Sequence, residues 1–244
     1  MSHARVWAEC SFIAEPKRAQ ALAEELCARV INVLRFWMAA SAAQPNFPVG
    51  IALEGDFADG SRMQIVRGPG GGVIWDHSDT RGLAPLSIGK NLMDAVRPIC
   101  CLLDFAFDPA KQSSFCQLIM HASRSFGKGK VSPYGEDRVV GYMIALEAFL
   151  NEKTIPLTES VSEGVATLLG GPIEARIQLK KDIKRIYGFR SRIAHGENIG
   201  ELDPADVRFL ENKVIAFILA MIGMRDMFQS KRDLLAHLER KRMS

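Results

Sequence analysis

From Ser87 onward, the apolar residues recur at helical spacing and the alternating pattern of strands disappears. This periodicity constrains the fold most, because a 3.6-residue repeat places apolar side chains on one face of a helix. It predicts helices over residues 92–107, 115–126, 137–151, 161–169, 173–195 and 205–228. Pro98 should kink or interrupt the first helix, and Asp203 followed by Pro204 suits the N-cap and first turn of the last. Residues 87–244 are therefore predicted to form an all-α domain, with an exposed connection at residues 128–133.

The first 86 residues have a different pattern. A long helix is predicted from Glu15 and Pro16 to about residue 43, with the proline in the first helical turn. Three short strand candidates follow, over residues 49–53, 63–66 and 73–75, and turn-forming clusters separate them. We therefore predict an α+β domain of unknown role over residues 1–86, in which a long helix precedes a small antiparallel meander.

The composition excludes several classes of function. The net charge of +3 is too small for a polycation, so any affinity for nucleic acid must come from a local patch. The five cysteines are odd in number and include no Cys-x-x-Cys pair, which gives no support to a zinc site or a disulfide framework and favours a reducing compartment. We expect neither a metal nor a cofactor.

The longest apolar run, from Val214 to Met224, is well short of the roughly 20 residues that span a bilayer. The N-terminus carries no apolar signal core. We therefore expect a cytoplasmic protein with no membrane partner. The apolar run itself predicts either central core or a dimer interface.

One carboxylate lies in apolar surroundings. The helix predicted over residues 139–150 is apolar almost all the way round, which is typical of a buried helix, and its ionisable carboxylate is Glu147. A buried carboxylate requires a basic partner or a raised pKa. On the helix that ends at His195, Arg190 falls within the apolar face. We predict that Glu147 pairs with Arg190, either as an ion pair that holds two helices in register or as part of a catalytic site.

Arg190 and His195 carry the chemistry of a second prediction. Arginine binds phosphate oxygens in a fixed fork, and histidine can carry a proton near neutral pH, so together they supply much of what metal-free phosphodiester cleavage requires. Residues five positions apart point well away from each other on an ideal helix. Gly196 could end the helix at His195 and let its side chain turn, or two subunits could combine their residues across an interface. Both arrangements stay open.

Two segments resemble the HEPN superfamily, with the closest likeness to the ApeA-like HEPN domains of bacterial anti-phage defence. The first segment, at residues 138–150, contains an Ala-Leu-Glu triplet that ends at Glu147. The second, at residues 186–196, contains the motif Arg190-Ser191-Arg192-Ile193-Ala194-His195. The resemblance covers roughly residues 90–228 and makes residues 87–244 a HEPN-type helical bundle.

The resemblance implies a homodimer that aligns two such motifs, and a metal-independent endoribonuclease in which the ribose 2′-hydroxyl attacks the adjacent phosphate. On this chain, His195 is the expected general base or acid, and Arg190 or Arg192 is expected to stabilise charge on the phosphate. Ser191 would orient the phosphate or the histidine, and Glu147 completes the site. The need for a 2′-hydroxyl would restrict cleavage to RNA.

Residues 172–195 carry seven lysines and arginines against two acidic residues. We predict that Lys181, Lys184, Arg185 and Arg192 form a track for the RNA backbone, with a solvated helix face as the alternative. The resemblance further implies an effector or toxin in defence or stress, with a cognate inhibitor or defence-system partner. Two other functions are open: a non-catalytic scaffold or sensor that binds RNA or nucleotide and recruits a partner, and an N-terminal sensor that holds the helical domain inactive.

Overall fold

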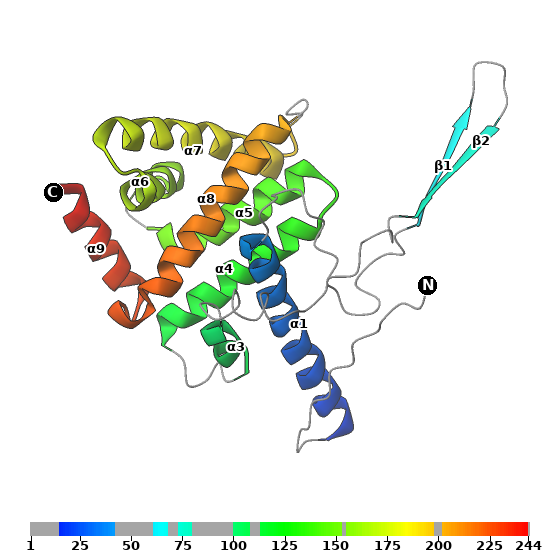
Figure 1. Ribbon diagram of the computed structural model, residues 1–244, viewed down its shortest axis with the longest axis horizontal. Coiled ribbons are helices and arrows are strands. Elements are labelled where there is room, and N and C mark those ends of the chain that lie inside the picture. Colours follow the sequence, from blue (N-terminus) through cyan, green and yellow to red (C-terminus); the bar gives the residue numbers. More distant parts are fainter. Residues whose placement is uncertain are drawn as a thin grey trace.

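The computed structural model describes residues 15–41, 61–67, 73–79, 100–107, 113–152, 155–197 and 202–243, and nearly all of these are helical (Figure 1). The bundle begins with two helices that are far apart in the sequence, α1 (Pro16–Ser41) and α3 (Cys100–Phe107). It continues with α4 (Ser114–Val131), α5 (Gly135–Leu150), α6 (Leu157–Leu169), α7 (Ile173–Ala194) and α8 (Pro204–Gly223). A 3-10 turn, η3 (Arg225–Met227), leads to α9 (Lys231–Met243).

The predicted α+β segment with an antiparallel meander is wrong. In the described residues, β1 (Ser61–Arg67) and β2 (Val73–Asp79) pair only with each other, and the third strand candidate, at residues 49–53, lies outside the described residues. The long helix α1 packs instead on α3 and α4. Its buried Phe36 meets Phe126 of α4 edge to face, with ring centroids 5.5 Å apart. The apolar face of α1 is therefore covered by helices, because it joins their core rather than a sheet.

The helical periodicity is confirmed over residues 100–107 and from residue 113 onward, with two corrections. The start of the first predicted helix and its interruption at Pro98 lie outside the described residues. α4 runs on to Val131 and occupies most of the predicted exposed connection, and the last predicted helix ends at Gly223 rather than at residue 228. Beyond it, α9 forms over a basic stretch because Leu234 and Leu238 are buried against the bundle. The boundary between residues 86 and 87 lies outside the described residues and stays a prediction, although α1 shares the core of the later helices.

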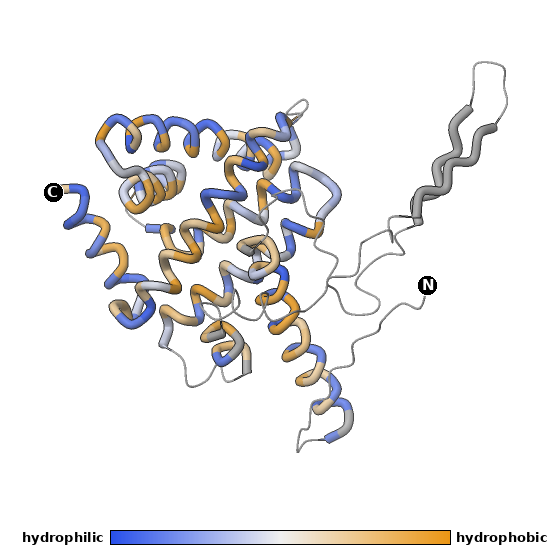
Figure 2. The backbone as a smooth tube through the Cα atoms, viewed as in Figure 1, coloured by the Kyte–Doolittle hydropathy of each residue, from blue (hydrophilic) through white to orange (hydrophobic). Residues whose placement is uncertain are grey.

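α5 lies at the centre of the bundle and contacts α4, α6, α7, α8 and α9. Its backbone touches that of α4, since a Cβ added to Gly141 would lie 2.8 Å from Cα of Gly129. α8 crosses α5 (Figures 1 and 2) and buries Val214, Phe217 and Met221, so one face of its apolar run is core, while Leu219 on the same run is exposed. α6 and α7 pack against each other, and both contact α5. Gly141 of α5 faces α4, whereas Glu147 of α5 faces α7.

Among the helices that the structure describes, none combines the length and the apolar character needed to cross a bilayer.

Candidate active site

α7 is a largely polar helix with one narrow buried face (Figure 2). Leu179, Ile183, Ile186 and Tyr187 are buried, and their spacing places them on the side that meets α5 and α6. Arg190 lies one turn beyond Ile186 and follows this face. The helix therefore delivers an arginine to α5 because its apolar stripe continues toward its C-terminal end.

The predicted pairing of Glu147 with Arg190 is present. Nη2 of Arg190 donates to Oε2 of Glu147 at 3.2 Å, and Nε lies 3.0 Å from Oε1 without the alignment of a hydrogen bond. The hydroxyl of Tyr187 donates to Oε1 of Glu147 at 2.8 Å. These three residues, which we call the open cluster, join α5 to α7 through one carboxylate, one cation and one phenol.

Part of the open cluster faces solvent. The Glu147 side chain is 13% exposed and the Arg190 side chain is 26% exposed. No described residue accepts a hydrogen bond from Nη1 of Arg190, so within the described part of the chain both donors of that nitrogen are unengaged. A guanidinium anchored on one edge by a carboxylate and open on the other can bind a phosphate oxygen.

His195 lies at the end of α7, where the predicted helix break is confirmed. The residue is the C-cap, and its N–H donates to the carbonyl of Ser191 at 3.1 Å. Gly196 has a φ of +71°, and the N–H of Glu197 donates to the carbonyl of Arg192 at 3.0 Å. This is the left-handed helix ending that glycine favours. His195 is consequently exposed beside the helix end rather than buried within the bundle.

The structure does not bring Arg190 and His195 together within one chain. Five residues turn an α-helix through about 500°, which leaves the two side chains roughly 140° apart around the axis. Arg190 is turned toward α5, whereas His195 is exposed at the end of α7. Ser191, which lies between them, is partly buried. Of the four predicted catalytic residues, Glu147 and Arg190 are in contact, and no contact between Arg190 and His195 is found in the described part of the chain.

Two of the four residues of the predicted RNA track are engaged in ion pairs. Lys184 pairs with Glu159 of α6. Arg185 makes two hydrogen bonds to Asp206 of α8, at 2.5 and 2.6 Å, and holds the pKa of that carboxyl below its usual value. These pairs tie α7 to its neighbours, so two members of the track are held by acidic residues of the same chain.

The other two members of the track differ from each other. The guanidinium of Arg192 lies over the ring of Phe189, with Cζ 5.0 Å from the ring centroid. Lys181 is exposed on the outer side of α7. In the described residues, Lys181 makes no ion pair with a carboxylate, so it and Arg192 are the members of the track that remain available to a polyanion.

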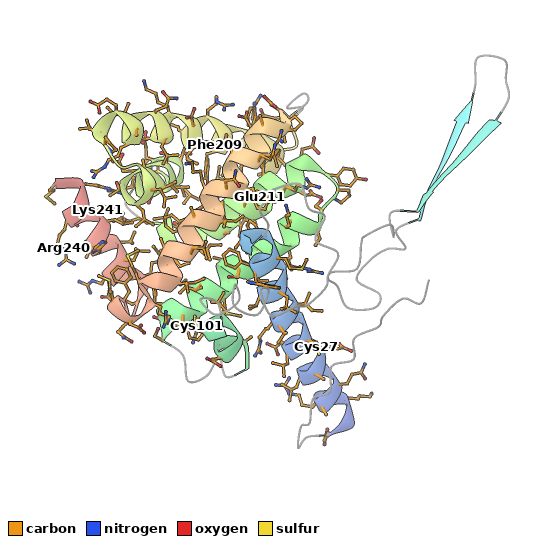
Figure 3. All side chains as sticks on the ribbon, in the orientation of Figure 1. Cys27, Cys101, Phe209, Glu211, Arg240 and Lys241 are labelled. Atoms are coloured by element: carbon orange, nitrogen blue, oxygen red, sulfur yellow. The ribbon has the colours of Figure 1, made fainter. Side chains whose placement is uncertain are left out.

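A second cluster of the same composition was not predicted. Nζ of Lys130 lies 2.6 Å from Oε1 of Glu211, and the hydroxyl of Tyr142 donates to Oε2 of the same carboxylate at 2.9 Å. We call these residues, which join α4, α5 and α8, the closed cluster. In Figure 3, Glu211 is labelled on α8 where that helix crosses α5. Glu211 falls four residues after the buried Val207 and three before Val214, so its place on an apolar face was the available signal.

Within the described ranges, no three histidine, cysteine, aspartate or glutamate side chains gather as metal ligands would. Comparison of the chain with protein-family models, with curated proteins and with solved structures finds no match. The resemblance to HEPN proteins therefore stays a prediction from the motif residues.

Proposed function

We propose that this chain is a metal-independent endoribonuclease of the HEPN type that acts as a homodimer, as an effector or toxin in a defence or stress response. One observation carries the proposal. Glu147 holds Arg190 through Nε and Nη2, and the exposed His195 lies about 7.5 Å farther along the axis of α7. A fixed arginine and an accessible histidine are the groups that RNA cleavage without a metal requires.

The proposed reaction is a transfer of the phosphate within the RNA. The ribose 2′-oxygen attacks the adjacent phosphorus, and His195 accepts the proton from that hydroxyl. Arg190 donates hydrogen bonds to the phosphate oxygens as charge builds up on them. The bond to the 5′-oxygen then breaks, that oxygen takes up a proton from water, and His195 releases its proton to the solvent. A 2′,3′-cyclic phosphate remains on the upstream fragment. A strand without 2′-hydroxyls cannot react.

The direct test incubates purified protein with mixed-sequence RNA, with and without EDTA, and identifies the ends of the fragments. We expect cleavage in both conditions, with 2′,3′-cyclic phosphate ends, and loss of cleavage in His195→Ala. The exposed His121 on α4 provides the matched control, since His121→Ala should cleave as the wild type does. Equal cleavage by His195→Ala would remove the enzymatic proposal.

Assembly across two subunits is tested by mixing inactive variants. Arg190→Gln and His195→Ala protomers, unfolded and refolded together, form heterodimers in which one composite site holds both an intact arginine and an intact histidine. If the site combines residues of two subunits, random mixing restores about a quarter of the wild-type sites. No recovery would show that each chain uses its own Arg190 and His195.

A second candidate is a non-catalytic scaffold that binds RNA or nucleotide and recruits a partner. Two observations favour this scaffold. Arg190 and His195 point in different directions, and Lys184 and Arg185 are held in ion pairs. Such contacts are also expected of a helix with a purely structural role. It predicts RNA binding that survives His195→Ala and no cyclic phosphate product. Fragment analysis therefore separates the two candidates.

A further inference from the structure

Tyr187 is the member of the open cluster that the proposed reaction does not use. Tyr187 is 4% exposed, and its hydroxyl donates to Oε1 of Glu147 at 2.8 Å. Because Tyr187 is buried, bulk water does not compete for its hydroxyl, and the carboxylate of Glu147 is its hydrogen-bond acceptor. A buried donor with a single charged acceptor fixes the position of that acceptor.

The position of Glu147 in turn sets the orientation of Arg190. Oε1 accepts from Tyr187 and faces Nε of Arg190, while Oε2 accepts from Nη2. A hydrogen bond to Oε1 therefore restrains rotation of the carboxylate about its terminal torsion, and with it the plane of the guanidinium. The ring of Tyr187 adds a second restraint, since Cζ of Arg190 lies 5.8 Å from the ring centroid.

We infer that Tyr187 is a positioning residue for phosphate recognition: through Glu147 and its own ring, it holds Arg190 so that Nη1 faces the open side of the cluster. The inference rests on the proposed function, because it assigns Arg190 a phosphate ligand. It adds a residue of α7, three positions before Arg190, that the motif itself does not contain.

The protonation state of Tyr187 suits this role. Burial and the Glu147 carboxylate both raise the pKa of its phenol well above the usual range. The hydroxyl thus remains a donor at every pH at which the enzyme is expected to work. Tyr187 itself transfers no proton in the reaction, so its removal should leave the shape of the pH profile unchanged.

The experiment compares Tyr187→Phe with Tyr142→Phe, which removes the matching hydroxyl from the closed cluster. Two quantities are measured on folded protein: kcat/KM for RNA cleavage, and the Kd for a single-stranded DNA oligonucleotide, which lacks the 2′-hydroxyl and is not cleaved. We expect Tyr187→Phe to lower kcat/KM about tenfold and to raise the Kd severalfold, with an unchanged pH profile. Tyr142→Phe should change neither quantity.

A double-mutant cycle tests the route through Glu147. In the Glu147→Ala background, Tyr187→Phe should have no further effect on either quantity. Wild-type values in Tyr187→Phe, equal losses in both phenylalanine variants, or additive losses in the double variant would each overturn the inference, as would a wild-type protein that does not bind the DNA. If the wild type binds the DNA but cleaves no RNA, the proposed enzymatic function fails, and the Kd values still decide the role of Tyr187.

Discussion

The open and closed clusters have the same chemical composition but different surroundings. Each contains a glutamate that accepts from a tyrosine hydroxyl and pairs with a cation, and each uses one residue of α5, Glu147 in the first and Tyr142 in the second. In the closed cluster the Lys130 and Glu211 side chains are 8% and 4% exposed. In the open cluster, Arg190 is 26% exposed.

The difference in exposure indicates which of the two clusters a ligand can reach. A lysine presents a compact charge, and here it is enclosed together with its carboxylate, which leaves no open side for an anion. An arginine can engage a carboxylate with one edge and a second acceptor with the other. We therefore assign the closed cluster to stability and the open cluster to ligand binding, although the two would look alike in a list of contacts.

The largest effect is expected from the closed cluster. Glu211→Gln removes the carboxylate charge from the buried Lys130 and weakens the acceptor of Tyr142, so the free energy of unfolding should fall by about 3–5 kcal/mol. Urea denaturation followed by circular dichroism measures it. The fraction that remains folded should still cleave RNA at the wild-type rate. A loss below about 1 kcal/mol would place this cluster with exposed ion pairs.

The open cluster is expected to show the opposite balance. Glu147→Gln frees Arg190 from its anchor, and RNA cleavage should fall about 10- to 100-fold while the free energy of unfolding falls by only about 1–2 kcal/mol. Cycles with Arg190→Lys measure the coupling between the two side chains. Additive effects of the two substitutions would show that the observed pair is not an energetic unit.

The two buried tyrosines should make the stability of the fold depend on alkaline pH. Burial, followed by the nearby carboxylate, raises the pKa of both Tyr142 and Tyr187 above the usual range. Folding therefore favours their neutral forms, and this contribution is complete below pH of about 10 and is lost as the pH rises through the folded pKa. Tyr142→Phe should reduce the alkaline loss of stability more than Tyr187→Phe, because Tyr142 is more deeply buried.

The smallest effect concerns the ion pair between α7 and α8. Arg185 lowers the pKa of Asp206, so the pair stabilises the fold above the unfolded pKa of an aspartate, about 3.9, and the contribution disappears as the pH falls below it. Because Arg185 is half exposed, Asp206→Asn should cost less than about 1 kcal/mol at neutral pH. Thermal unfolding at pH 3 and pH 7 is the measurement, and an equal loss at both would contradict the assignment.

The pairing of Glu147 with Arg190 in the open cluster was predicted from the sequence for a physical reason, whereas the part of Tyr187 was not predicted. Glu147 is a charged residue in a helix that is otherwise apolar, and Arg190 falls on an apolar stripe. Each buried charge requires a partner of opposite sign, so the two were expected to pair with each other. The end of α7 was predictable in the same local way, since Gly196 follows His195 directly. Short-range patterns of this kind are visible without knowledge of the tertiary structure.

The closed cluster and the covering of α1 depend on contacts between distant segments. Lys130 lies in a Gly-Lys-Gly-Lys run that predicts an exposed connection, and it is buried because α4 continues through this run and packs against α5 and α8. The apolar face of α1 could equally well cover a sheet or helices, and the meander was predicted because the strand candidates follow it in sequence. Periodicity shows which face is buried and does not identify the partner that buries it.

The most direct test measures Glu147→Gln and Glu211→Gln side by side, for unfolding free energy and for RNA cleavage per folded molecule. The account predicts a crossover: Glu211→Gln loses more stability and keeps its activity, whereas Glu147→Gln loses activity and keeps most of its stability. If both variants lose activity only in proportion to the folded fraction, the open cluster is a structural ion pair like the closed one, and the assignment of a site at Arg190 is wrong.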